Sequence, residues 1–447
     1  GDGISRPRKG VAFADGLIAT RTPLPPRPDV CNGALIRERS GTMLRTLRSA
    51  IRFRRFRLSK TTRRLERAAN VADLRLMAHR RLPGGVFDYI DGAAEDERTL
   101  ARSMSAFTDH EFVPRVLRDV SNVDLSSTLL GKKLAFPFVL APTGFTRIAH
   151  SEGELAVARA AARAELPYSL STLGTRSIEE VAQANAGRKW FQVYVWRDRG
   201  LVKELVTRAA EAGYEAIMPT VDLATFGRRE RDVRRGFSLP PKIGLDTIVD
   251  GIRKPGWTID FLRGGPIRFA NVATAESSGT RDGTDAINLA AYANEQLDPS
   301  LSWDDIEWFR DFWHGPIVVK GIQSVDDARI AADLGIDAIC LSNHGGRQLE
   351  GSPAPVSLVA PVAQEIQGRS EIICDGGIRR GSDILKAVAL GATATMGGRA
   401  YLFGLGAAGE RGVDTALGFL QAELARTMAL NGLTSFDEVG PHIVAPA

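Results

Sequence analysis

The chain has 447 residues, of which 44% are hydrophobic and 25% are charged, as is typical of a folded protein. No apolar run is long enough to form a membrane-spanning helix, and the three cysteines, Cys31, Cys340 and Cys374, lack the spacing of metal ligands. These features exclude a protein that crosses the bilayer. They predict a cytoplasmic protein with reduced cysteines and no metal site.

Charge is distributed unevenly along the chain. Residues 1–70 contain 17 Lys and Arg against 5 Asp and Glu, a net charge of +12, whereas the whole chain carries +5. The remaining residues must therefore carry −7, and the basic character belongs to the N-terminal part alone. Because the body of the protein is acidic, we expect no nucleic-acid partner.

Residues 1–70 form a predicted basic N-terminal extension, and residues 71–447 form the predicted folded domain. The first 43 residues are rich in Pro, Gly and Arg without periodicity, which indicates disorder. Residues 44–67 combine apolar residues with many cations. This pattern is typical of a basic amphipathic helix that contacts an anionic membrane surface, and it fits a solvated tail equally well.

The folded part alternates short apolar runs with Ala-rich amphipathic segments. Eight strand–helix repeats of this kind predict a closed (β/α)₈ TIM barrel, an α/β fold. An open, doubly wound sheet is the alternative, but no Gly-x-Gly-x-x-Gly turn opens the first repeat. The predicted strands are residues 138–141, 168–171, 190–195, 216–221, 316–320, 338–342, 371–374 and 394–396.

The connection between the fourth and fifth predicted strands is unusually long, and we place an insertion at residues 235–300. Residues 245–270 contain apolar residues, among them Trp257, Phe261 and Leu262, interleaved with Arg and Lys. Apolar anchors flanked by cations are typical of a membrane interface. They fit a subunit interface or a lid over an active site equally well.

The loop after the sixth predicted strand contains two residues suited to acid–base chemistry. His344 can accept a proton near neutral pH, and Arg347 can bind a carboxylate through two hydrogen bonds. In a TIM barrel such loops meet at one mouth with the active site. The pattern therefore indicates an enzyme that deprotonates a small acid. A surface turn with a solvated His and Arg is the alternative.

The last two predicted strands are each followed by glycines and an arginine. Gly376-Gly377 precedes Arg379, and Gly397-Gly398 precedes Arg399. Glycines let backbone N–H groups approach an anion closely, and these two loops are the usual phosphate site of the fold. The sequence therefore predicts a phosphorylated cofactor or substrate.

One loop resembles the signature of the FMN-dependent enzymes that oxidise L-2-hydroxy acids, namely Ser342-Asn343-His344-Gly345-Gly346-Arg347-Gln348. That family includes glycolate oxidase, L-lactate dehydrogenase and mandelate dehydrogenase. The resemblance runs from about Ala72 to His442 and is greatest to bacterial, membrane-associated L-lactate dehydrogenases. Further motifs in the family's order are Phe87-Asp88-Tyr89, Ala141-Pro142-Thr143-Gly144, Phe191-Gln192-Val193-Tyr194, Thr220-Val221-Asp222, Val319-Lys320-Gly321, Asp375-Gly376-Gly377 and Gly398-Arg399.

The resemblance implies FMN as the cofactor and four catalytic residues. His344 is expected to accept the substrate proton, and Asp222 to stabilise the imidazolium that results. Tyr194 is expected to hydrogen-bond the substrate hydroxyl, and Lys320 to lie beside the N1/O2 edge of the flavin. The implied carboxylate ligands are Tyr89, Arg229 and Arg347. The implied FMN contacts are Thr143, Gly144, Ser171, Gln192, Thr220, Lys320, Ser342, Asp375, Gly377, Arg379, Gly398 and Arg399.

Two positions depart from the oxidases of this family. Gly144 stands where glycolate and lactate oxidases have Ala, which resembles mandelate dehydrogenase and several lactate dehydrogenases. Leu173 replaces the Trp of glycolate oxidase and favours a substrate side chain larger or more apolar than that of glycolate. Residues 1–70 are too short and basic for a heme domain, so we expect an external electron acceptor.

We therefore predict the oxidation of L-lactate to pyruvate with a quinone-type acceptor. The resemblance also implies a homotetramer that lies peripherally on the inner face of the cell membrane. An (S)-mandelate-type dehydrogenase and an oxidase that uses O₂ are the alternatives. A non-catalytic flavin-binding scaffold is the alternative from another class, and the presence of His344, Asp222 and Arg347 argues against it.

Overall fold

The computed structural model describes residues 59–235, 245–272 and 295–447. The predictions for residues 1–58, including most of the basic segment 44–67, lie outside the described residues. From Ser59 to Ala447 the chain forms one compact unit.

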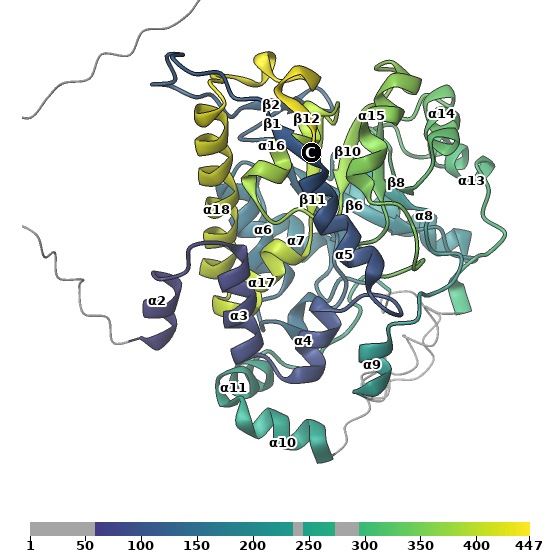
Figure 1. Ribbon diagram of the computed structural model, residues 1–447. Helices are drawn as coiled ribbons and strands as arrows, with labels where there is room; N and C mark the ends of the chain where they lie inside the picture. The colour runs from purple at the N-terminus through teal and green to yellow at the C-terminus, as the bar shows by residue number, and fades with distance from the viewer. Residues whose placement is uncertain (1–58, 236–244, 273–294) are drawn as a thin grey trace, which may run out of the picture. The chain divides into compact units, whose positions relative to one another are not determined.

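Eight parallel strands form a closed barrel (Figure 1), which confirms the predicted TIM barrel. Their order around the barrel follows the chain, and the barrel closes where the last strand, β11, pairs with the first, β4. Every predicted strand is present. The strands are β4 (Phe138–Leu140), β5 (Tyr168–Ser171), β6 (Lys189–Tyr194), β7 (Ala216–Thr220), β8 (Val318–Ile322), β9 (Ala338–Ser342), β10 (Glu371–Asp375) and β11 (Ala394–Gly397).

Alternate strand residues fill the two cores of the barrel. In β4, Val139 belongs to the inner cluster, whereas Phe138 and Leu140 pack outward against the helices. In β10, Ile373 points inward and Ile372 outward in the same way. Because strand side chains alternate between faces, the near-continuous apolar runs of the sequence are explained by burial on both sides.

The register of the strands brings polar residues together at the C-terminal mouth. Ser171 pairs with Gln192, Thr220 with Lys320, and Ser342 with Asp375. Each pair lies at or near the C-terminal end of its strand, where active sites of this fold are built.

Helices surround the barrel, and side-chain caps fix several of their starts. Ser177 forms a capping box with Glu180, and Asp198 accepts from the N–H of Leu201. These helices are α6 (Glu154–Arg163), α7 (Ile178–Ala184), α8 (Arg199–Glu211), α14 (Val325–Asp333), α15 (Pro355–Ile366), α16 (Gly381–Ala389), α17 (Arg399–Ala408) and α18 (Glu410–Leu430).

Four helices precede the barrel, and they correct the predicted boundary of the extension. The compact unit begins at Ser59 rather than after residue 70, because α2 packs Leu65 into the core and contacts α17. The basic composition of this stretch hid its single buried apolar residue. The helices are α2 (Lys60–Leu65), α3 (Val71–Arg81), α4 (Gly84–Asp91) and α5 (Arg98–Ser105).

Short elements complete the unit outside the barrel. β1 pairs antiparallel with β12 at the chain's end, and β2 forms a hairpin with β3. Their bounds are η1 (Ala106–Asp109), β1 (His110–Phe112), β2 (Ser127–Leu129), β3 (Lys132–Leu134), η2 (Thr146–Ile148), η4 (Phe436–Glu438), η5 (Pro441–Ile443) and β12 (Val444–Pro446).

The long connection between β7 and β8 contains helices that are tied to the barrel. Asp260 accepts hydrogen bonds from the hydroxyl of Ser151 at 2.6 Å and from Arg81 at 3.0 Å. Trp257 donates from Nε1 to the carbonyl of Ile148 at 2.7 Å. The described elements are α9 (Glu230–Arg234), α10 (Leu245–Arg253), α11 (Pro255–Arg263), α13 (Asp304–Glu307) and η3 (Trp308–Asp311). Among the described residues, no helix is both long and apolar enough to cross a membrane.

Candidate active site

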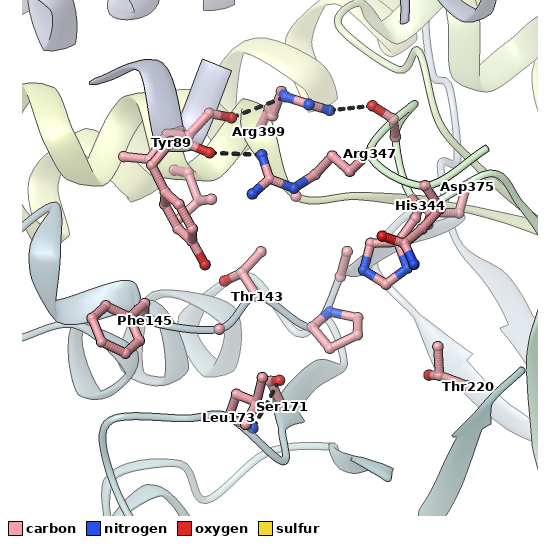
Figure 2. A pocket seen from close by; sticks show the side chains of 18 of the residues that line it. Tyr89, Thr143, Phe145, Ser171, Leu173, Thr220, His344, Arg347, Asp375 and Arg399 are labelled. Carbon is pink, nitrogen blue, oxygen red and sulfur yellow. Dashed lines mark hydrogen bonds between the residues drawn. The ribbon is translucent and has the colours of Figure 1, made fainter. Parts of the chain in front are cut away.

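A cavity of about 460 Å³ opens at the C-terminal mouth of the barrel (Figure 2). Apart from Asp222 and Ser342, every site residue named in the sequence analysis lines it. These two lie directly behind the lining and hydrogen-bond to residues within it. The structure therefore brings together residues that the sequence spreads from α4 to the start of α17.

His344 is held by Asp222 at the edge of this cavity. Its Nδ1 lies 3.1 Å from Oδ1 of Asp222 and 3.2 Å from Oδ2. Burial alone would raise the pKa of Asp222, but the charge and hydrogen bond of His344 lower it overall. With Nδ1 bonded to a carboxylate, Nε2 is the ring nitrogen free to exchange a proton.

The backbone of His344 is in the left-handed region, with φ of 56°. This conformation is uncommon for residues other than Gly, and such strain concentrates at functional sites. The N–H of His344 donates to the hydroxyl of Ser342 at 3.1 Å, which helps to hold the turn.

Lys320 lies in a buried polar cluster beneath the cavity. Its Nζ donates to the hydroxyl of Ser342 at 2.9 Å and lies 3.1 Å from Asp375. Ser342 in turn donates to Asp375 at 2.8 Å. Burial would lower the pKa of Lys320, but the carboxylates of Asp375 and Asp222 outweigh it and raise the pKa. The ammonium therefore remains charged.

A row of hydrogen bonds crosses three neighbouring strands at the mouth. Oε1 of Gln192 accepts from the hydroxyl of Ser171 at 3.1 Å, and its Nε2 donates to Thr220 at 3.0 Å. In the loop after the neighbouring strand β4, the hydroxyl of Thr143 shares a hydrogen bond of 2.8 Å with that of Tyr401 on α17. These contacts fix the direction of the polar groups that line the cavity floor.

Two guanidinium groups lie on the ring of Tyr89. The Cζ atom of Arg347 is 5.0 Å from the ring centroid, and that of Arg229 is 5.5 Å away. Burial, followed by the charge of Arg229, lowers the pKa of Arg347 to about 10. Arg229 also lies 3.5 Å from Asp232, so the two cations share one carboxylate and keep a positive charge that a further anion would stabilise.

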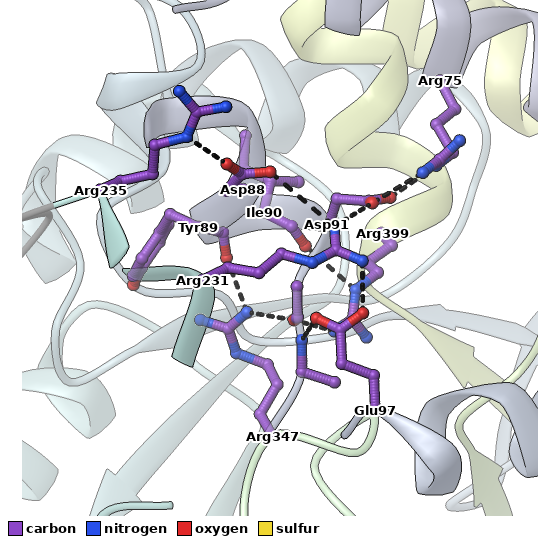
Figure 3. Close-up of polar contacts among 12 residues, drawn as sticks. Arg75, Asp88, Tyr89, Ile90, Asp91, Glu97, Arg231, Arg235, Arg347 and Arg399 are labelled. Atoms are coloured by element: carbon purple, nitrogen blue, oxygen red, sulfur yellow. Dashed lines mark hydrogen bonds and ion pairs between the residues drawn. The ribbon is translucent and has the colours of Figure 1, made fainter. Parts of the chain in front are cut away.

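The C-terminal end of α4 is held by the arginines of the site (Figure 3). Arg347 donates to the carbonyls of Tyr89 at 2.6 Å and of Gly92 at 3.0 Å. Arg399 donates to the carbonyls of Ile90 at 3.0 Å and of Gly92 at 2.7 Å. These carbonyls have no partners within the helix, so the arginines satisfy the helix end while the helix fixes the arginines.

Ion pairs connect α4 to α3 and α9 on the outer side (Figure 3). Asp91 is paired with Arg75 at 2.5 Å and with Arg231 at 3.0 Å. Arg231 also pairs with Glu97, and Arg235 donates to Asp88 at 3.0 Å. The helix that carries Tyr89 is therefore anchored from two sides.

The loops after β10 and β11 form a cationic corner. A Cβ added to Gly377, whose φ is +80°, would lie 2.0 Å from the carbonyl of Ser103, so only Gly fits there. Burial lowers the pKa of both Arg379 and Arg399. The hydrogen bonds of these two arginines go to backbone carbonyls, which leaves their positive charge available to an anion.

The space beside Gly144 is limited by Leu173. A Cβ built on it would lie 3.3 Å from the Cβ of Leu173, tighter than normal packing. A methyl group at residue 144 would therefore lie against the Cβ of residue 173, and one of the two would have to shift slightly to admit it.

Sequence reasoning missed the apolar part of the lining. Phe145 and Leu223 directly follow Gly144 and Asp222, so their adjacency to site residues is a signal that could have found them. Phe269 lies in the insertion, and no local signal in the sequence distinguishes it from the other apolar residues there. Among the missed apolar residues are Phe145, Ile148, Leu223, Phe226, Phe269, Ile378 and Leu402.

Comparison with known proteins identifies the family. Residues 78–446 match the FMN-dependent dehydrogenase family. The chain belongs to this family. It is therefore an FMN-dependent enzyme that oxidises 2-hydroxy acids, as the sequence analysis predicted.

Relatives in the FMN-dependent dehydrogenase family have several names. A putative L-lactate dehydrogenase of Mycobacterium tuberculosis is 47% identical over 90% of this chain and 95% of its own. Glycolate oxidase 3 of Oryza sativa subsp. indica is 40% identical over 84% of this chain and 95% of its own. The crystal structure of a monotopic membrane protein, (S)-mandelate dehydrogenase, has a TM-score of 0.81 and 37% identity, covering 85% of this chain and 100% of that one.

The cavity is suited to FMN, the cofactor of the family. Its volume is within the range of cofactor sites, roughly 300–1,000 Å³. The corner formed by Arg379 and Arg399 suits a phosphate, and the row from Ser171 to Thr220 suits the polar edges of an isoalloxazine ring. The donor set therefore fits both ends of the molecule.

Proposed function

We propose that this enzyme oxidises L-lactate to pyruvate and passes the electrons to a quinone-type acceptor. The proposal rests on one observation above all. His344, supported by Asp222, faces the same cavity as the cations Arg347 and Arg229. A proton acceptor and a carboxylate site in one cavity are what a 2-hydroxy acid requires. The L-lactate dehydrogenases among the relatives favour lactate within this class.

In this proposal, His344 takes the substrate proton on Nε2. Asp222 keeps Nδ1 protonated, orients the ring and stabilises the positive charge that develops. Arg347 and Arg229 hold the carboxylate, and Tyr89 supports both through its ring face. Tyr194 donates to the substrate hydroxyl; its enclosure raises the pKa of the phenol, which therefore keeps its proton.

The residues proposed to hold FMN divide by the part of the cofactor they face. Arg379, Arg399, Gly377 and Gly398 receive the phosphate, and Asp375 the ribityl chain. The ring contacts proposed are Thr143, Gly144, Ser171, Gln192, Thr220, Lys320 and Ser342. Bound there, FMN supplies the two-electron acceptor for the substrate. The charged Lys320 then offers positive potential to the ring edge.

Anaerobic mixing with substrate tests the proposal. The absorbance of the bound flavin should bleach with L-lactate and remain with D-lactate. The arginines that bind the carboxylate and the base His344 together select one enantiomer. Absence of bleaching with every L-2-hydroxy acid tried would refute it.

A mandelate-type dehydrogenase is the second candidate, favoured by the similarity to (S)-mandelate dehydrogenase structures and by Gly144 and Leu173. Steady-state kcat/KM values on L-lactate and (S)-mandelate separate the two. An oxidase would instead release hydrogen peroxide in air. Turnover with a quinone analogue and little peroxide would support the dehydrogenase.

We further propose peripheral contact with the inner face of the cell membrane through segments 44–67 and 245–270. In the second segment, Val249, Ile252, Ile259 and Leu262 expose apolar side chains beside the cations Arg253 and Arg263. The similarity to a monotopic membrane protein agrees with this. A homotetramer is proposed as well, and light scattering of the holoenzyme tests it.

A further inference from the structure

The insertion contributes one aromatic side chain to the active-site cavity. Phe269 follows α11, is 1% exposed and lines the cavity. Its ring centroid lies 4.9 Å from that of Phe145, with a tilt of 60° between the planes. A pair of this geometry is a favourable aromatic contact, so the two rings support each other.

Hydrogen bonds hold the segment that carries Phe269. The N–H of Ala270 donates to the carbonyl of Gly174 at 3.2 Å. Oδ1 of the buried Asn271 accepts from the N–H of Ile178 at 2.8 Å. Both partners belong to the loop and helix that follow Leu173. The ring of Phe269 is therefore placed relative to Leu173 by the hydrogen bonds of the two residues that follow it.

Phe145, Leu173 and Phe269 form an apolar wall of the cavity, on the side opposite the proton acceptor. In Figure 2, Phe145 and Leu173 lie across the cavity from His344 and Asp375. A Cβ added to Gly144 would lie 3.3 Å from that of Leu173, and Phe269 packs on Phe145. Leu173, Phe145 and Phe269 all line the cavity.

We propose that Phe269 is a specificity-determining residue that limits the length of the substrate side chain. This inference rests on the proposed function. With the carboxylate on Arg347 and the hydroxyl near His344, the side chain of an L-2-hydroxy acid extends toward the wall. In this proposal the methyl group of lactate is accommodated, and a branched or aryl side chain is limited by the ring of Phe269. The insertion thereby acts on substrate choice.

Two substitutions of Phe269 test this inference. In Phe269→Leu and Phe269→Ala, kcat/KM for L-2-hydroxy-4-methylpentanoate should rise relative to that for L-lactate by at least about tenfold, the discrimination expected from one or two methylene groups. The control is Phe312→Leu, which alters a half-buried aromatic residue of the same connection that lies outside the cavity. It should leave the ratio unchanged. A ratio that stays constant or moves toward L-lactate in both Phe269 variants overturns the inference.

A binding measurement keeps this outcome separate from that of the proposed function. Propanoate and 4-methylpentanoate lack the hydroxyl and are titrated into the FMN holoenzyme while the flavin absorbance is followed. Phe269→Leu should strengthen 4-methylpentanoate binding relative to propanoate by about tenfold. If no hydroxy acid bleaches the wild-type flavin, the proposed function fails, and this affinity ratio alone decides the inference. An unchanged affinity ratio overturns it.

Discussion

At the scale of single residues, the site is a set of charges held in unfavourable surroundings. Arg347 and Arg229 repel each other on one tyrosine ring, and burial lowers the pKa of Arg379 and Arg399. His344 has a left-handed backbone. Such features cost stability in the free protein, and a bound anion would offset the repulsion and burial of the arginine charges. They therefore indicate preorganisation for carboxylate and phosphate groups.

The role assigned to His344 leads to a first prediction. His344→Gln should retain bound FMN and lose about 10²–10⁴-fold in kcat, the usual contribution of a positioned general base. Flavin absorbance after gel filtration measures retention, and a dye-coupled assay measures kcat. The control is His314→Gln, an exposed histidine before β8. Turnover close to that of the wild type in His344→Gln would contradict the assigned role.

Replacement of Arg347 by lysine gives a second prediction. Lysine keeps the positive charge but lacks the planar guanidinium group, which can donate several hydrogen bonds at once. In Arg347→Lys, one ammonium cannot satisfy the carbonyls of Tyr89 and Gly92 and also bind a carboxylate. KM for L-lactate should rise by roughly 10–100-fold. Arg310→Lys, on an exposed arginine remote from the mouth, serves as the comparison. Equal KM values for both variants would remove Arg347 from the substrate site.

At the scale of elements, α4 connects the stability of the fold to the geometry of the site. Its last carbonyls hold Arg347 and Arg399, while Asp91 on its other face binds Arg75 and Arg231. Burial alone would raise the pKa of Asp91, but the two arginines lower it overall. The carboxylate is therefore charged throughout the neutral range, and the helix is anchored there.

Substitution of Asp91 yields a third prediction, with a definite dependence on pH. A carboxyl group whose pKa is lowered by folding adds stability above its unfolded pKa of about 3.9 and loses it as the pH falls toward the folded value. Asp91→Asn should therefore lower stability at pH 7 by about 1–2 kcal/mol, less than a fully buried pair because both arginines reach solvent. The difference from the wild type should shrink below about pH 4.

Urea unfolding at pH 7 and pH 3.5 measures this effect. The control is Asp96→Asn, which removes the exposed pair with Arg98 and should change the urea midpoint little at either pH. A stability difference for Asp91→Asn that grows in acid would have the wrong sign for the assigned ion pairs.

At the scale of the whole molecule, two parts of the long connection after β7 have different surroundings. One part, around Phe269, enters the cavity. Another part, on α10 and α11, exposes apolar side chains, with Leu262 72% and Ile252 72% exposed. Asp260 and Trp257 of α11 are hydrogen-bonded to the β4–α6 loop, and Ile148 of that loop lines the cavity. A surface that docks on α11 is therefore separated from the site by this loop alone.

The proposed membrane contact gives a fourth prediction. Leu262→Glu should weaken co-sedimentation with phosphatidylglycerol-containing vesicles by about tenfold, because a charged residue replaces an apolar anchor. Leu430→Glu is the matched control, since Leu430 is 70% exposed on α18. Equal loss of binding in the two variants would show that charge alone, and not this surface, governs the association.

The sequence by itself determined the barrel and most of the site. Each barrel strand is buried on both faces, as Ile372 and Ile373 of β10 show. Successive residues of a strand must therefore nearly all be apolar, and such a run is visible in the sequence. Lys320 lies within such a run, in β8, and His344 lies two residues after another, β9. Since parallel strands of a closed barrel end at one mouth, their convergence follows from order along the chain alone.

Only the tertiary structure decided how the apolar wall closes, where the compact unit begins and how α4 is anchored. Phe269 meets Phe145, Leu65 meets the core beside α17, and Arg347 meets the end of α4, each across a long separation in sequence. Contacts of this kind depend on the path of the chain in space. They leave no periodicity or spacing in the residues that make them, and so the sequence alone does not contain a local sign of them.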